Sequence, residues 1–132
     1  MKNGRLFSAN DIFAKHVGIE LLEGSPGKAK AKLTLVDHHL NSFKTVHGGV
    51  IFTLADFVFA VAANLHGTVA MAINVNISYL KAVTGGTLLA EAEEVSLNPK
   101  LGMYAVRVTD EKGDIIATFQ GMVYRKKDPI PG

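Results

Sequence analysis

The fold is decided by one stretch, His47-Gly48-Gly49 followed by the apolar run VIFTLADFVFAVAANL of residues 50–65. The run has no proline or internal glycine and is too long for an ordinary strand, so it predicts a helix of four to five turns. Because the run is apolar on nearly every side, we expect this helix to be buried within the domain. It is shorter than the roughly 20 apolar residues of a membrane span and contains Asp56, so no membrane crossing is expected.

A short helix and a hairpin are predicted before the central helix. Ser8 is the expected cap of a helix over residues 9–17. Residues 19–23 and 28–36 flank a turn-rich segment, which predicts two paired strands. Period two places three lysines on one face of the second strand, where they would face solvent or protect a sheet edge. These lysines are Lys28, Lys30 and Lys32.

After the central helix, from Val69 onward, apolar and polar residues alternate with a period of two, as in a strand. Gly85-Gly86 then predicts a hairpin turn. Three further strands are predicted over residues 88–96, 103–108 and 115–124. Together they indicate an antiparallel meander, and the tail from Asp128 to Gly132 is expected to fray.

Length and composition indicate one domain over residues 1–132. With 132 residues, 48% of them hydrophobic, the chain is long enough to bury a core. The predicted elements give an α+β fold in which five or six strands curl around one helix. The absence of cysteine excludes disulfides and thiolate nucleophiles, and a net charge of +2 gives no sign of nucleic-acid binding. The first seven residues lack a secretory pattern, so we expect a cytoplasmic protein.

Asp56 is the first candidate for chemistry, because ionising a carboxylate inside an apolar helix is costly unless something compensates. Thr53, Ala60 and Asn64 share one side of the helix, with Gly49 and Asp56 at its border, so small and polar groups form a narrow strip. Perturbed carboxylates are enriched at functional sites. The structural alternative is an Asp56 satisfied by a backbone amide or a lysine of the sheet.

His47-Gly48-Gly49 is the second candidate, because it lies where the helix begins. Unpaired amides and the positive end of the helix dipole are presented there, and glycines allow another group to approach closely. Such a corner can hold a carbonyl oxygen that develops negative charge. The alternative is an ordinary turn.

Other chemistries lack their motifs in this sequence. The histidines show no metal-ligand spacing, so we predict no metal and no other cofactor. No phosphate-binding loop, dinucleotide fingerprint or nucleophile elbow is present.

The whole segment from Asn41 through His47-Gly48-Gly49 to Asp56 resembles the hotdog-fold acyl-CoA thioesterases of the phenylacetate-degradation (PaaI-like) type. The resemblance extends along most of the chain and implies a helix wrapped by a curved antiparallel sheet. It also implies pairing into homodimers or homotetramers, with the site between two subunits, so that Asp56 faces the partner's His-Gly-Gly corner. The substrate would be a small or aromatic acyl-CoA.

The same resemblance assigns roles to individual residues. Asp56 would be the general base or the nucleophile, and the amide of Gly48 or Gly49 would bind the thioester oxygen. His47 would orient this corner, and Asn41 would help to position the carbonyl or water. Thr53 would contact Asp56 or line the pocket, or it would simply pack in the helix with a satisfied hydroxyl.

The chain departs from the family pattern at Ala70-Met71-Ala72, where many relatives carry a serine or threonine. For the phosphates of CoA, basic residues at strand ends and turns are candidates, although solvated surface charge is an alternative for each of them. They are Lys81, Lys100, Arg125, Lys126 and Lys127.

Two other functions stay open. A hotdog-fold hydroxyacyl dehydratase would use a carboxylate and a histidine to move protons along a β-hydroxyacyl chain. A non-catalytic acyl-CoA-binding module would use the same fold without turnover. The place of Asp56 inside the helix, nine residues after His47, favours the thioesterase.

Overall fold

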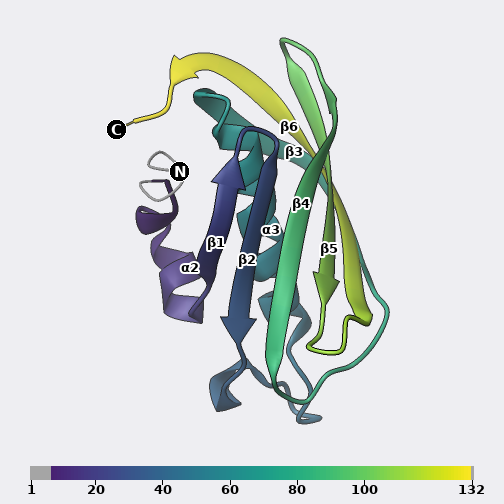
Figure 1. The fold of residues 1–132 in the computed structure, drawn as a ribbon. Coiled ribbons are helices and arrows are strands. Elements are labelled where there is room, and N and C mark those ends of the chain that lie inside the picture. Colours follow the sequence, from purple (N-terminus) through teal and green to yellow (C-terminus); the bar gives the residue numbers. More distant parts are fainter. Residues whose placement is uncertain (1–6, 132) are drawn as a thin grey trace.

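The computed structural model describes residues 7–131 as a curved antiparallel sheet wrapped around one long helix (Figure 1). Within this range the six strands follow the order β1-β2-β4-β5-β6-β3. The elements are α2 (Ile12–Val17), β1 (Glu20–Ser25), β2 (Lys28–Thr34), η1 (Asp37–His39), α3 (Gly48–Asn64), β3 (Thr68–Tyr79), β4 (Thr87–Leu97), β5 (Leu101–Thr109) and β6 (Ile115–Pro129). The predicted α+β architecture is confirmed. Gly132 and residues 1–6, which carry the expectation of no secretory signal, lie outside the described range.

Helix α3 forms the centre of the core, as the sequence predicted. It begins at Gly48, two residues before the predicted start, because His47 provides its N-cap. Side chains such as Leu54 and Phe59 are almost completely buried against the sheet. Helix and sheet pack closely at Gly121 of β6, where a Cβ atom would lie 2.6 Å from the Phe59 ring. No helix between residues 7 and 131 combines the length and apolarity needed to cross a membrane.

The predicted meander is wrong at strand β3. This strand pairs with β6 at the far edge of the sheet, and residues 80–86 carry the chain across to β4 instead of forming a hairpin at Gly85-Gly86. The N–H of Val46 donates to the carbonyl of Val83 at 2.8 Å, which fastens this crossover to the loop before α3. Alternation of apolar and polar residues identifies a strand but not the strand with which it pairs. β3 is therefore an edge strand, with no neighbour on its outer side within residues 7–131.

The two ends of the described chain also differ from expectation. Helix α2 is capped by Asp11, whose side chain accepts the Ala14 N–H at 2.9 Å, and not by Ser8. The tail does not fray at Asp128 to Ile130, because β6 continues to Pro129 and the Ile130 N–H donates to Gly67. Backbone pairing with the start of β3 orders this segment.

Candidate active site

The first turn of α3 presents one unused backbone amide. His47 precedes the helix in an extended conformation, and its Nδ1 accepts the N–H of Gly49 at 2.8 Å. The carbonyl of His47 accepts the N–H groups of Val50 and Ile51. The N–H of Gly48 has no acceptor among the residues that the structure describes. It is therefore the available donor at the positive end of the helix.

These hydrogen bonds distinguish the amides of Gly48 and Gly49, which the sequence alone could not do. Gly49 is occupied by the histidine cap, whereas Gly48 is open. Because Nδ1 of His47 accepts a hydrogen, the hydrogen of the uncharged imidazole is on Nε2.

Tyr79, the last residue of β3, fixes the other side of Gly48. Its hydroxyl donates to the Gly48 carbonyl at 3.0 Å, and a Cβ at position 48 would lie 3.3 Å from the ring. A hollow of about 310 Å³ lies beside them, lined by Thr45, Val46, Gly48, Ile51, Tyr79, Leu80, Lys81, Ala82 and Val83. Sequence reasoning missed Tyr79, because period two placed it on a strand without showing that its hydroxyl returns to the helix.

Asp56 is partly buried and has no hydrogen bond or ion pair within residues 7–131. Burial raises the pKa of the Asp56 carboxyl above its ordinary value, and the charge of Asp11 at the start of α2 raises it further. The structural alternative needs a backbone amide or a lysine beside this carboxylate. Neither is bonded to it in the described chain.

Asp56 belongs to a stripe of α3 that is only half-buried. Beyond the first turn, the residues of α3 that are not buried are Phe52, Thr53, Asp56 and Ala60, which recur at helical spacing on one face. Asn64, which helical spacing placed on the same side as Thr53 and Ala60, is buried. Its side chain bonds to the backbone of Ala70 and so ties the end of α3 to β3.

The hydroxyl of Thr53 is used inside its own helix. It donates to the carbonyl of Gly49, one turn earlier, at 2.7 Å. No hydrogen bond joins Thr53 to Asp56 in this structure. Thr53 therefore matches the alternative role, in which its hydroxyl is satisfied within its own helix. Its side chain still lies on the half-buried stripe.

Asn41 closes the loop before the helix. Its Oδ1 accepts the N–H groups of Phe43 and Thr45 at 2.9 and 3.2 Å, and its Nδ2 donates to the Thr45 hydroxyl at 3.0 Å. One hydrogen of the Asn41 amide is left for a ligand.

Lys81 is engaged by two carboxylates. Its Nζ lies 2.6 Å from Asp114 and 3.1 Å from Asp110, and these bonds raise the pKa of Lys81. Both acids come from the turn after β5, so the sequence did not suggest the contact. A Lys81 held in this way is less available to a phosphate.

Lys100 and Arg125 lie together at the opposite end of the sheet. The N–H of Arg125 donates to the Lys100 carbonyl at 2.7 Å, and its guanidinium donates to the Asn98 carbonyl. Arg125 is opposite Ala70 in β3, whereas Tyr79 contacts Gly48. The nine residue steps from Ala70 to Tyr79 correspond to about 30 Å of strand.

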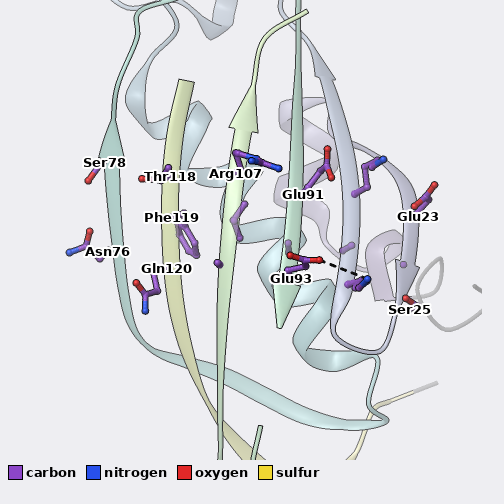
Figure 2. Close-up of a pocket in the computed structure, with 17 residues that line it drawn as sticks. Glu23, Ser25, Asn76, Ser78, Glu91, Glu93, Arg107, Thr118, Phe119 and Gln120 are labelled. Atoms are coloured by element: carbon purple, nitrogen blue, oxygen red, sulfur yellow. Dashed lines mark ion pairs between the residues drawn. The ribbon is translucent and has the colours of Figure 1, made fainter. Parts of the chain in front are cut away.

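A larger hollow, of about 1040 Å³, lies on the outer face of the sheet and contains neither Asp56 nor Gly48 (Figure 2). Lys30, Glu91 and Arg107 are neighbours across three strands there, and Lys28 pairs with Glu93. The lysines of β2 thus face outward, but β2 lies inside the sheet and protects no edge. Opposite charges facing each other across strands are typical of a solvated sheet face.

Gly48 and Asp56 of one chain cannot act on the same carbonyl group. They are eight residues apart on one helix, which places them about 12 Å apart along its axis. An oxygen nucleophile and an oxyanion donor must both lie about 3 Å from the reacting group. A site that uses both groups would therefore need them from two copies of the chain.

Comparison with known proteins identifies the family. The model of the thioesterase superfamily matches residues 43–117, which include His47, Gly48 and Asp56. The chain belongs to the thioesterase superfamily. The predicted class of enzyme, a thioester hydrolase, is thereby confirmed.

Individual members of the superfamily support this assignment over the whole chain. The acyl-coenzyme A thioesterase PaaI of Escherichia coli is 31% identical over 132 residues, covering 99% of this chain and 94% of PaaI. Its structure superimposes with a TM-score of 0.94 at 30% identity, over 98% of this chain and 95% of that chain. The predicted hotdog fold and PaaI-like resemblance are confirmed.

Two further solved structures are similar. The TT0310 protein of Thermus thermophilus is 35% identical with a TM-score of 0.85, over 89% of this chain and 99% of that chain. The smu.793 protein of Streptococcus mutans, solved bound to acetyl-CoA, is 25% identical with a TM-score of 0.81, over 85% and 91% of the two chains.

Proposed function

We propose that this protein is an acyl-CoA thioesterase that hydrolyses a small or aromatic acyl-CoA to the free acid and CoA. Its similarity to an E. coli acyl-CoA thioesterase and to a protein that binds acetyl-CoA supports this substrate class. The observation that carries the proposal is the half-buried stripe of α3. The Asp56 carboxylate on this stripe lies about 12 Å along the axis from the Gly48 amide, and neither group has a hydrogen-bond partner among residues 7–131.

The complete site is formed by two copies of the chain. Strand β3 is twelve residues long, has no neighbour on its outer edge among residues 7–131, and exposes Ile73, Val75 and Tyr79. A long apolar edge of this kind is suited to pairing with another strand. If two β3 strands pair antiparallel about a two-fold axis, the two α3 helices are also antiparallel. Asp56 of one subunit then faces Gly48 of the partner subunit.

The chemistry needs an oxygen nucleophile and a stabilised oxyanion. In one route Asp56 takes a proton from water, and the oxygen of that water attacks the thioester carbon. In the other, the Asp56 carboxylate attacks directly and forms a mixed anhydride that water then cleaves. In both, the Gly48 N–H binds the developing oxyanion, the C–S bond breaks, and the CoA sulfur leaves as a thiolate that takes up a proton.

The neighbouring residues hold this arrangement. His47 fixes the first turn by capping Gly49, which keeps the Gly48 amide pointing outward. Asn41 offers its remaining amide hydrogen to the carbonyl or to water, while its other bonds shape the loop. Thr53 lines the surface beside Asp56.

The phosphates of CoA are assigned to the basic cluster of Lys100 and Arg125, with Lys126 and Lys127 beside it. In one chain this cluster is distant from Gly48, but antiparallel β3 pairing brings the start of one strand beside the end of the other. Lys100 and Arg125 of the partner subunit would then flank the corner. Lys81 is the weaker candidate because two carboxylates hold it.

Thiol release from a panel of short, aromatic and long acyl-CoAs tests the function. The chain has no cysteine, so a thiol reagent detects only released CoA. We expect turnover by the wild type and a loss of about 10²- to 10⁴-fold in Asp56→Asn. Glu93→Gln, which removes an exposed carboxylate of the outer face, serves as the matched control and should retain full activity.

The other outcomes identify the alternatives. Binding of acyl-CoA without thiol release would indicate the binding module. Conversion of a β-hydroxyacyl-CoA without free thiol would indicate the dehydratase. Light scattering on the same sample distinguishes dimer from tetramer, and a protein that stays monomeric with substrate would contradict the two-copy site.

A further inference from the structure

His39 is a buried histidine that the proposed chemistry does not use. Only 3% of its surface is exposed. Its Nδ1 accepts the N–H of Val36 at 3.0 Å, and its Nε2 lies 2.6 Å from the carbonyl of Val17. Because Nδ1 accepts, the hydrogen of the ring is on Nε2 and donates to Val17. The ring thus fastens η1 to the end of α2.

The backbone of the same residue holds the active-site corner. The carbonyl of His39 accepts the N–H of His47 at 2.8 Å. The loop between them is closed by the isolated bridge of Leu40 with Val46. His47 in turn caps Gly49, whereas the Gly48 amide has no acceptor among residues 7–131. A continuous series of hydrogen bonds therefore runs from Val17 to the first turn of α3.

We propose that His39 is a positioning residue for the Gly48 amide donor, acting through its backbone bond to His47. The proposal rests on the proposed function, because it assigns His39 to the same corner. His39 contacts no substrate in this arrangement. Its ring sets where its own carbonyl lies, and that carbonyl sets where His47 begins the helix.

A positioning role has a kinetic signature. An oxyanion donor interacts more strongly with the transition state than with the bound substrate, so its displacement lowers kcat more than it changes KM. A displacement of about 1 Å can reduce the rate by about 10²-fold. A purely structural histidine would instead lower stability without this selective effect on kcat.

The test compares three variants with the wild type. His39→Leu fills the space but leaves the Val36 N–H and the Val17 carbonyl without partners. We expect its kcat to fall about 10- to 100-fold, with KM within about threefold of the wild type. His39→Gln restores an N–H donor near the Nε2 position and should recover most of the lost turnover. If His39→Leu does not fold, His39→Asn takes its place with the same expected result.

Tyr104→Phe is the matched control for lost stability. Tyr104 is completely buried, and its hydroxyl bonds to Glu94 at 2.8 Å, near the end of α3 remote from Gly48. This variant also loses a buried hydrogen bond, but its kcat should equal that of the wild type. Equal kcat values for Tyr104→Phe and His39→Leu would overturn the proposal.

Amide hydrogen exchange gives a readout that does not depend on activity. In His39→Leu the protection of the His47 and Gly49 amides should fall, and in His39→Gln it should return. Unchanged protection of both amides would also overturn the proposal. If the wild type hydrolyses no acyl-CoA, the proposed function fails, and the exchange result alone decides whether His39 holds the corner.

Discussion

The ring of His47 accepts the backbone hydrogen of Gly49 at 2.8 Å, so a histidine side chain caps the central helix. This single contact occupies one of the two glycine amides at the corner. The Gly48 N–H is the donor at this corner that has no acceptor among residues 7–131. The helix start and the proposed oxyanion site are therefore the same structure.

Replacing this cap should affect stability and turnover together. His47→Ala removes the acceptor, and loss of an N-cap costs about 1 kcal/mol. We expect a lower melting temperature and a kcat reduced about tenfold, because the first turn frays around Gly48. His47→Asn supplies a preferred N-cap and should restore both. Thermal unfolding and thiol release measure the two effects. A His47→Asn protein that is as stable as the wild type but as slow as His47→Ala would show that the imidazole itself takes part in the chemistry.

The pH dependence of kcat/KM should report the environment of Asp56. Its pKa is raised above 3.8 by burial and by the charge of Asp11, and the proposed reaction needs the ionised form. Activity should therefore decline on the acid side at a higher pH than for an ordinary aspartate. Asp11→Asn keeps a good helix cap and removes one cause of the shift, so the acid limb should move to lower pH. An unmoved limb would show that another group controls it.

Asp56 should also lower the stability of the fold at neutral pH. Its pKa is higher in the folded than in the unfolded chain, so the folded state binds the proton more tightly. The unfavourable contribution appears as the pH rises from 3.8 through the raised value, and it is complete above that value. Asp56→Asn should therefore melt a few degrees higher at pH 7, by about 2–5 °C, and the difference should disappear below the ordinary pKa. A less stable Asp56→Asn at pH 7 would indicate a structural carboxylate.

Gly121 should tolerate no side chain, because α3 lies directly against it. A Cβ there would approach atoms of the Phe59 ring at 2.6 to 2.9 Å. We expect Gly121→Ala to lower the free energy of unfolding by roughly 1–3 kcal/mol, measured by denaturant titration. Gly85→Ala is the control, since a Cβ at Gly85 meets no atom within 4 Å. Equal stability of the two variants would contradict the close packing of helix and sheet.

The sequence predicted the central helix and most of the strands because their periodicities are local. It could not place β3 beside β6, since the alternation of Ile73 and Val75 with polar residues identifies a strand and not its neighbour. From the sequence we expected Ser8 to cap the first helix, but Asp11 caps it. Several good capping residues lie close together there, and only the chain's path selects one.

The candidate site was predicted to the level of residue types and general position. Helical spacing placed Asp56 on a strip with Thr53 and Ala60. It did not predict that β3 buries Asn64. Contacts between residues that are distant in the sequence could not be predicted from local patterns. Lys81 meets Asp110 and Asp114 only because the crossover passes the turn after β5.

Hybrid dimers test the two-copy site most directly. Asp56→Asn removes the carboxylate. Gly48→Pro removes the amide hydrogen at the first helical position, where proline is well accepted, and His47 already has an extended conformation suited to precede it. The Cβ of the proline would lie 3.3 Å from the Tyr79 ring, so this side chain must shift slightly. Each variant alone should be nearly inactive.

A refolded equal mixture of the two variants should regain about a quarter of wild-type thiol release. Half of the dimers are then hybrids, and each hybrid has one of its two sites intact. Light scattering and tag capture verify that hybrids form. If they form and the mixture is still no more active than its separate components, the site is not shared between two copies of the chain.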